Sequence, residues 1–232
     1  MRKLSALYRY FTHMERLLWG VSMLLILLAY LLFDRQSPLT LTASLIGVTA
    51  LIFTAKGNPL GQLLMVFFSL LYGVISWQFH YYGEMLTYMG MTMPMSLFAL
   101  IAWLRHPFQG QLAQVTVARL RPGEPWLLAL LTAAVTVAFY FLLRHFGTAS
   151  LLPSTLSVTT SFAAVYLTFR RNPHYALAYA LNDAVLILLW LLAARTHQRY
   201  LSVAVCFCAF LVNDLYGFLC WRTMEKHQQA VL

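Results

Sequence analysis

The chain has 232 residues, of which 61% are hydrophobic and only 10% are charged, and its formal net charge is +9. This composition excludes an ordinary soluble domain, in which about 25% of the residues are charged. The 16 Lys and Arg residues lie between apolar segments instead of forming one basic face, so the charge indicates membrane topology and not nucleic-acid binding.

Eight apolar segments are long enough to cross a membrane, because a spanning helix needs about 20 residues. The first follows several basic residues but ends without a small-residue cleavage pattern, so we expect a retained helix instead of a signal peptide. Before it, Leu4, Leu7, Phe11 and Met14 recur at a spacing that predicts a short amphipathic helix at the membrane surface, with a frayed tail as the alternative. The predicted spans are 17–33, 39–55, 59–79, 84–104, 126–143, 151–169, 174–194 and 200–221.

The basic residues are distributed unevenly between the two sides of the membrane. Twelve of the 16 Lys and Arg residues lie in the N-terminus, the C-terminus and the second, fourth and sixth loops. Because loops rich in Lys and Arg stay in the cytoplasm, both termini are predicted to be cytoplasmic. Tryptophans near the span ends are expected in the interfacial aromatic belt, namely Trp19, Trp77, Trp103, Trp126 and Trp221.

Two parts of the chain resemble each other. The turns 56–59 and 170–173 both end in Asn-Pro, and a tryptophan followed by a basic residue closes each part at Trp103 and Trp221. Asn172 follows Asn58 by 114 residues, and Trp221 follows Trp103 by 118. This collinearity predicts two parallel three-helix repeats joined by a linking helix, unless the similarity is a matter of chance.

The predicted organisation has four parts. Residues 1–38 form an amphipathic segment and the first span, and residues 39–106 form the first three-helix repeat. Residues 107–150 form a cytoplasmic loop and the linking helix, and residues 151–232 form the second repeat and the C-terminal tail.

Two Asn-Asp steps, Asn182-Asp183 and Asn213-Asp214, interrupt otherwise apolar spans. A charge inside the bilayer costs roughly 3 kcal/mol on insertion scales, so such a residue is normally turned inward and used. The two steps therefore predict a polar site inside a helical bundle, and hence transport.

The span 174–194 carries most of the expected substrate-binding residues. Tyr179, Asn182 and Trp190 share one helical face, and Asp183 follows Tyr179 by four residues. Such a face can stack an aromatic ring, hydrogen-bond hydroxyl groups and neutralise a positive charge. The alternative is that Trp190 anchors the helix at the interface while Asn182 only joins helices.

Other spans contribute further candidates. Tyr72, Tyr88 and Thr92 are expected to line the same path, with helix packing as the alternative for a small hydroxylated residue such as Thr92, and Pro94 is expected to kink the span 84–104. Asn213 and Asp214 are expected to form a gate or a second polar site, with helix packing as the alternative.

Several functions are excluded by missing motifs. The chain has no P-loop and no signature of a hydrolase, so we expect no catalytic residues and no cofactor. Its three cysteines share one apolar stretch and have no metal-ligand spacing, so we expect no metal site. The expected partners are membrane lipids and a small-molecule substrate, moved passively or with an ion.

The stretch 57–107, GNPLGQLLMVFFSLLYGVISWQFHYYGEMLTYMGMTMPMSLFALIAWLRHP, and the C-terminal LVNDLYGFLCWR resemble the PnuC family of bacterial nicotinamide riboside transporters. The similarity covers about residues 40–225 and rests on the glycine-tyrosine pattern, the YYGE step and the tryptophan-basic helix ends. It implies an all-helical fold related to the SWEET sugar transporters, with two parallel three-helix bundles, a linking helix and here an extra N-terminal helix.

The resemblance also implies a function. It implies facilitated diffusion across the bacterial inner membrane, metabolic trapping by a cytoplasmic kinase, and assembly into trimers. A tryptophan-rich substrate motif of the family matches Tyr179 and Asn182, with tyrosine standing where tryptophan is expected.

The residues and the resemblance lead to one expected substrate. The cationic ring of nicotinamide riboside suits Asp183 with Tyr179 and Trp190, and Asn182 suits an amide or the ribose. Thiamine, a deoxynucleoside or another vitamin of the same family stays open as an alternative substrate. A membrane sensor or assembly subunit, in which the buried Asn and Asp residues only hold helices together, stays open as an alternative function.

Overall fold

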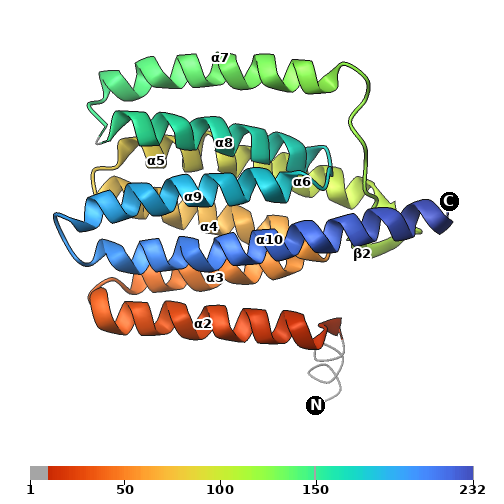
Figure 1. Cartoon of the computed structure of the whole chain (residues 1–232), viewed down its shortest axis with the longest axis horizontal. Helices are drawn as coiled ribbons and strands as arrows, with labels where there is room; N and C mark the ends of the chain where they lie inside the picture. The colour runs from red at the N-terminus through yellow and green to blue at the C-terminus, as the bar shows by residue number, and fades with distance from the viewer. Residues whose placement is uncertain (1–9, 149, 232) are drawn as a thin grey trace.

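The computed structural model describes residues 10–148 and 150–231 and is almost entirely helical (Figure 1). Within these residues, eight helical spans are long and apolar enough to cross a membrane, which confirms the predicted all-helical polytopic fold. The amphipathic helix expected around residues 4–14 lies largely outside the described residues. The spans are α2 (His13–Phe33), α3 (Pro38–Ala55), α4 (Leu60–Gln78), the interrupted span α5 (Tyr82–Thr87), η1 (Tyr88–Thr92) and α6 (Met93–Arg105), then α7 (Glu124–His145), α8 (Leu151–Phe169), α9 (Tyr175–Ala194) and α10 (Tyr200–Val231).

The spans run side by side, and two of them flank the others (Figure 1). α2 packs against α3 and α10 on one side of the bundle, and α7 packs against α8 on the other. Between them, α10 packs against α3 and α9, while α6 packs against α4 and α8. These contacts make a central group of six helical segments, and the predicted polar face of α9 lies within this group. Its members are α3, α4, α6, α8, α9 and α10.

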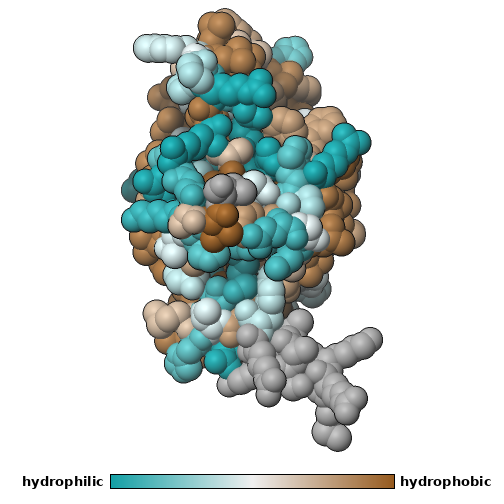
Figure 2. Space-filling model, turned by 90° about the vertical axis from the view of Figure 1, so that its right-hand side faces the viewer, coloured by the Kyte–Doolittle hydropathy of each residue, from teal (hydrophilic) through white to brown (hydrophobic). Residues whose placement is uncertain are grey.

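The two ends of the bundle differ. At one end, β1 (Pro107–Phe108) and β2 (Gln111–Val115) form an antiparallel hairpin between α6 and α7. We name this the hairpin end, and the opposite end, which holds the α2–α3 connection, the Asp34 end. Figure 2 looks onto the hairpin end, where hydrophilic residues gather while the sides of the bundle are hydrophobic. This distribution fits a bundle whose sides face lipid and whose end faces water.

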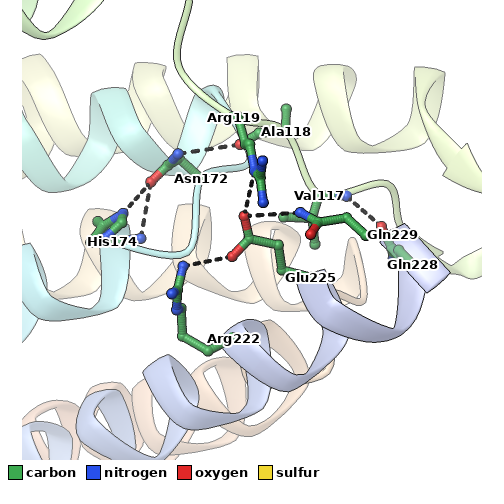
Figure 3. Close-up of polar contacts among 9 residues, drawn as sticks. All are labelled: Val117, Ala118, Arg119, Asn172, His174, Arg222, Glu225, Gln228 and Gln229. Atoms are coloured by element: carbon green, nitrogen blue, oxygen red, sulfur yellow. Dashed lines mark hydrogen bonds and ion pairs between the residues drawn. The ribbon is translucent and has the colours of Figure 1, made fainter.

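The last helix is longer than the predicted span 200–221 and continues to Val231. Its extra turns are stabilised by the hairpin end, because the Gln228 amide donates to Val115 O (3.0 Å) and accepts from Val117 N (2.8 Å). Glu225 binds Arg119 and Arg222 at 3.1 and 2.7 Å (Figure 3). The expected cytoplasmic loop is therefore a folded segment held against the end of α10.

The fourth span is not a continuous α-helix. Its middle turn, η1, is a π-helix that ends two residues before Pro94. Pro94 has no backbone N–H to donate to the preceding turn, which explains why the regular ladder is interrupted there. The predicted kink is thus a local widening of the helix, a feature frequently found at functional sites.

The two Asn-Pro turns have the same conformation. Gly57 and Arg171 both adopt a left-handed φ, at +68° and +57°. The next residue in each turn is an asparagine whose side-chain Oδ1 atom accepts a hydrogen bond from the backbone N–H two residues later. The distances are 2.9 Å for Asn58 and 3.1 Å for Asn172. Residues 115–118, from the end of β2 onward, join both turns, because Val115 N donates to Gly57 O (2.9 Å) and Ala118 N donates to Arg171 O (3.0 Å).

Trp103 and Trp221 make reciprocal contacts between the two parts of the chain. The indole of Trp103 donates to Thr168 O at 3.0 Å, and that of Trp221 donates to Thr54 O at 2.8 Å. Both side chains are fully buried, so the prediction that they lie in the interfacial belt is wrong. Trp19, Trp77 and Trp126 are exposed, as that prediction requires. The reciprocal contacts support the two-repeat organisation, which stays a prediction.

Candidate functional site

Asn182 and Asp183 lie in the middle of α9, a helix without glycine or proline, and both are buried. The Asn182 carbonyl oxygen accepts hydrogen bonds from the hydroxyls of Thr160 and Ser161 on α8, each at 2.9 Å. These two donors fix the orientation of the amide, and the Tyr88 hydroxyl lies beside it. The structure thus brings Tyr88 and Asn182 together, as the sequence predicted.

Asp183 faces Asp214 of α10 across the α9–α10 contact. The Asp183 Oδ2 atom is buried and has no hydrogen-bond partner among the described residues. Tyr179 lies one turn earlier on α9, near both carboxyl groups. Tyr179, Asp183 and Asp214 therefore form one polar cluster at the α9–α10 contact.

Aromatic side chains lie above this polar region, toward the Asp34 end. The indole of Trp190 donates to the Tyr72 hydroxyl at 2.6 Å, and the rings of Tyr72 and Tyr88 lie 4.4 Å apart. Tyr81 packs on Trp190 with ring centroids 4.9 Å apart. Because Trp190 is fully buried, it is not an interfacial anchor, and the structure places it with Tyr72 and Tyr88.

Two predicted residues behave differently. Thr92, in the last position of η1, is buried, and its hydroxyl has no partner in the described part of the chain. Asn213 donates to Ser22 Oγ on α2 at 2.9 Å and to Ala209 O at 2.8 Å. Asn213 therefore faces α2, and the structure does not bring it to the other candidates.

Glu84, which the sequence pattern did not single out, is also buried. Its side chain is fully inaccessible, and the Ser157 hydroxyl donates to its Oε2 atom at 3.3 Å. The Oε1 atom has no partner among the described residues. Glu84 begins the predicted span 84–104, so the apolar pattern alone treats it as a boundary residue. The available signal was its position four residues before Tyr88, on the same helical face.

Several buried polar atoms in the centre of the bundle have no hydrogen-bond partner in the described residues. Buried polar groups are normally paired, so an unpaired group calls for a ligand, a water or a functional reason. The central atoms are Ser69 Oγ, Ser76 Oγ, Glu84 Oε1, Thr92 Oγ1 and Asp183 Oδ2.

The centre is closed in this structure. A cavity of about 10 Å³ beside Tyr72 is room for roughly one water molecule. Much larger cavities lie at the two ends, about 670 Å³ beside Lys56 at the hairpin end and about 570 Å³ beside Asp34 at the other. A substrate would therefore need the bundle to open on one side before it could reach the unpaired atoms.

The charges of the site are also unbalanced. The described Lys, Arg and His residues lie in loops, near span ends or in the extra turns of α10. Four ion pairs are present in the described residues, and all of them lie at the hairpin end. Three buried acids, Glu84, Asp183 and Asp214, therefore have no basic partner. Such a site suits a ligand that carries positive charge and hydrogen-bonding groups.

No group of three or more His, Cys, Asp or Glu residues in the described part of the chain could hold a metal ion. The candidate residues at the centre offer carboxyl, amide, hydroxyl and aromatic groups. Groups of these kinds can bind and orient a ligand.

Known proteins resemble this chain over nearly its whole length. The model of the family described as nicotinamide mononucleotide transporter matches residues 37–223. The nicotinamide riboside transporter PnuC of Neisseria mucosa is 26% identical over 224 residues, which cover 94% of this chain and 84% of that protein. The nicotinamide riboside transporter PnuC of Haemophilus influenzae is 23% identical over 193 residues, which cover 82% of each chain. These matches confirm the family resemblance.

A solved structure shows the same fold. The crystal structure of the vitamin B3 transporter PnuC superposes on this chain with a TM-score of 0.83, at 22% identity and with 94% of each chain covered.

Proposed function

Since the chain belongs to the nicotinamide mononucleotide transporter family, and is a membrane transporter and not an enzyme, we propose that its substrate is nicotinamide riboside. Both PnuC relatives carry this substrate in their names. The observation that carries the proposal is the set of buried, unpaired polar atoms beside the aromatic residues Tyr72, Tyr88 and Trp190. An aromatic ring, a carboxamide and a ribose would together use these groups.

The charge of the site favours the riboside over the mononucleotide. A phosphate group adds close to two negative charges, so it is normally bound by basic residues. The centre of the bundle instead holds Glu84, Asp183 and Asp214 with no basic residue paired to them. Nicotinamide riboside is a cation, so it would be attracted where the mononucleotide would be repelled.

Six of the seven predicted substrate-binding residues have a place in this proposal. Asn182, oriented by α8, would bind the carboxamide or ribose, and Tyr179 would lie at the side nearer the hairpin end. Tyr72, Tyr88 and Trp190 would contact the ring, and Thr92 would offer its unpaired hydroxyl. Transporters built from repeats place their substrate near the membrane midplane between the repeats, which is where these residues lie in the proposed organisation.

The transport mechanism is part of the proposal. The closed centre between two end cavities fits alternating access, in which each end opens in turn. With no nucleotide-binding motif, transport would be facilitated diffusion across the bacterial inner membrane, with both termini cytoplasmic and the product trapped by a cytoplasmic kinase. Assembly into trimers rests on the resemblance alone.

Transport by the purified protein in liposomes tests this proposal. Labelled nicotinamide riboside should equilibrate across the membrane without an ion gradient, and the unlabelled mononucleotide should compete poorly. Thiamine or a deoxynucleoside that is carried better would replace the proposed substrate, and accumulation driven by a proton or sodium gradient would contradict facilitated diffusion. Absence of transport of any of these compounds would favour the sensor or assembly function.

A variant tests the assigned position. Asn182→Leu should weaken binding by about 10-fold or more, since it leaves polar groups of the substrate unpaired. Asn213→Leu makes the same change on a residue that faces α2, so it should leave substrate affinity nearly unchanged. Equal loss of affinity in both variants would show that the amides hold the fold and not the substrate.

A further inference from the structure

Glu84 is confined by the packing of α5. A Cβ atom added at the preceding residue, Gly83, would lie 2.9 Å from Thr148 Cγ2 and 3.2 Å from Leu143 Cδ2. The backbone at Gly83 is therefore in close contact with the end of α7 and the connection between α7 and α8. The Glu84 side chain extends into the bundle, where the Ser157 hydroxyl donates to Oε2. It is fully buried and cannot turn toward water without moving the helix.

The surroundings of Glu84 are aromatic. Tyr88 lies one turn further along the same span, and Tyr72 lies near it across the contact with α4. Tyr81, three residues earlier, packs on Trp190. A flat ring placed among these side chains would meet aromatic faces on its sides and the unpaired Oε1 atom at its edge.

Glu84 differs from the other buried acids of the centre. Asp183 and Asp214 face each other, and two carboxylates held together in a low-dielectric interior oppose each other's ionisation. Glu84 has neither an acidic neighbour that would hold a proton with it nor an ion-pair partner among the described residues. An isolated buried carboxyl group is stable in its charged form only beside a counter-charge, because burial of an unpaired charge is costly, and without one it keeps its proton. A bound cation would supply that counter-charge.

We propose that Glu84 supplies the negative charge that recognises the positively charged ring of the substrate and thereby selects cationic over neutral nucleosides. This inference rests on the proposed function. The sequence alone favoured Asp183 as the charge partner, and the structure points to Glu84 because Asp183 already faces another acid.

A matched pair of ligands tests the role of Glu84. Nicotinamide riboside and its reduced dihydro form share the ribose and the carboxamide, but only the oxidised form carries a ring charge. The affinity of the purified full-length protein for each ligand is measured for wild type, Glu84→Gln, Glu84→Asp and Asp183→Asn. Thermal unfolding of each variant shows whether it is folded.

Glu84→Gln should weaken binding of nicotinamide riboside by about 10- to 100-fold, as expected for loss of a charge-assisted contact, and change binding of the reduced form little. Glu84→Asp keeps the charge, so it should retain the preference for the cation even if both affinities fall. Asp183→Asn should affect the two ligands alike.

Three outcomes would overturn the inference. In the first, Glu84→Gln loses the same affinity for both ligands, and in the second it loses no affinity for either. In the third, Asp183→Asn, and not Glu84→Gln, loses affinity for the cationic ligand alone. Wild-type protein that binds neither ligand would contradict the proposed function itself, so the two failures are distinguishable. If Glu84→Gln does not fold, the ligand preference of Glu84→Asp decides, because a preference lost while the charge is kept contradicts the role assigned to Glu84.

Discussion

Asp34 lies in the short connection between α2 and α3, outside the spans, and its side chain is only 6% exposed. Burial raises the pKa of its carboxyl group above the ordinary value of 3.8, although nearby Thr40, Ser202 and the positive charge of Arg199 oppose the shift. The residue lines the 570 Å³ cavity of the Asp34 end. A buried carboxylate at this place therefore makes the stability of this end depend on pH.

The direction of that dependence follows from the raised pKa. The folded protein holds the Asp34 proton more tightly than the unfolded chain does, so the favourable contribution is present below about pH 3.8 and is lost as pH rises through the folded pKa. Asp34→Asn should therefore reduce the fall in melting temperature between about pH 4 and pH 7. Unfolding of the detergent-solubilised protein followed at several pH values checks this. Arg199→Gln should enlarge the fall, and a steeper fall in Asp34→Asn would contradict the assignment.

At the scale of helices, the contact between α3, α4 and α10 depends on a glycine. A Cβ atom added at Gly47 would lie 2.3 Å from Phe210 Cζ and 2.9 Å from Phe68 Cδ2. These two phenylalanine rings already pack on each other with centroids 5.3 Å apart. The absence of a side chain at Gly47 is therefore what allows the three helices to approach.

Gly47→Ala should destabilise the protein by about 1–3 kcal/mol, because extra volume in a packed core forces side chains and backbone to shift. Gly20→Ala is the matched control, since a Cβ atom at Gly20 on α2 would meet nothing within 4 Å. The control should be neutral or slightly stabilising, because alanine favours a helix over glycine by up to about 1 kcal/mol. Melting temperatures of both variants measure the difference. Equal melting temperatures would show that the helices can separate at Gly47 without cost.

The hairpin end is also an element-scale feature that local sequence does not reveal. Residues 115–118, from the end of β2 onward, contribute backbone donors to both Asn-Pro turns, and Asn172 Nδ2 donates to Ala118 O at 3.2 Å (Figure 3). Gln228 of α10 holds the same segment through two further hydrogen bonds. The segment therefore ties the ends of α3, α8 and α10 together.

For the whole molecule, the described start of the chain and the end of α10 both lie at the hairpin end (Figure 1). In the sequence, 12 of the 16 Lys and Arg residues belong to the termini and to the second, fourth and sixth loops, and these three loops lie at the hairpin end, so it is expected to face the cytoplasm. A C-terminal fusion to green fluorescent protein should fluoresce, and one to alkaline phosphatase should be inactive. Alkaline phosphatase inserted after Arg35, at the opposite end, should be active. An active C-terminal phosphatase fusion would contradict this orientation.

The eight spans could be predicted from the sequence because length and hydropathy are properties of each segment by itself. The polar face of α9 could also be predicted, since the helical period alone places Asn182 with Tyr179 and Trp190 on one side. The helical period likewise places Tyr72 with Ser69 and Ser76, and Tyr88 with Thr92, each set on one face of its own span. These features need no knowledge of which helices are neighbours.

The remaining features depend on contacts between helices that are distant in the sequence. Trp103 and Trp221 match the pattern of interfacial residues, yet both are buried, and the indole N–H of each donates to a backbone carbonyl of a helix distant in the sequence, α8 for Trp103 and α3 for Trp221. Asn213 and Asp214 are adjacent in the sequence, but the Asn213 side chain hydrogen-bonds to Ser22 of α2, whereas Asp214 faces Asp183 of α9. Glu84 begins a span in the sequence, and only the packing of α5 against α7 and α8 encloses it in the core. The sequence by itself thus determined which segments cross the membrane, whereas the partner of each polar group was decided by the tertiary structure, because a buried hydrogen bond or charge depends on the neighbouring helix.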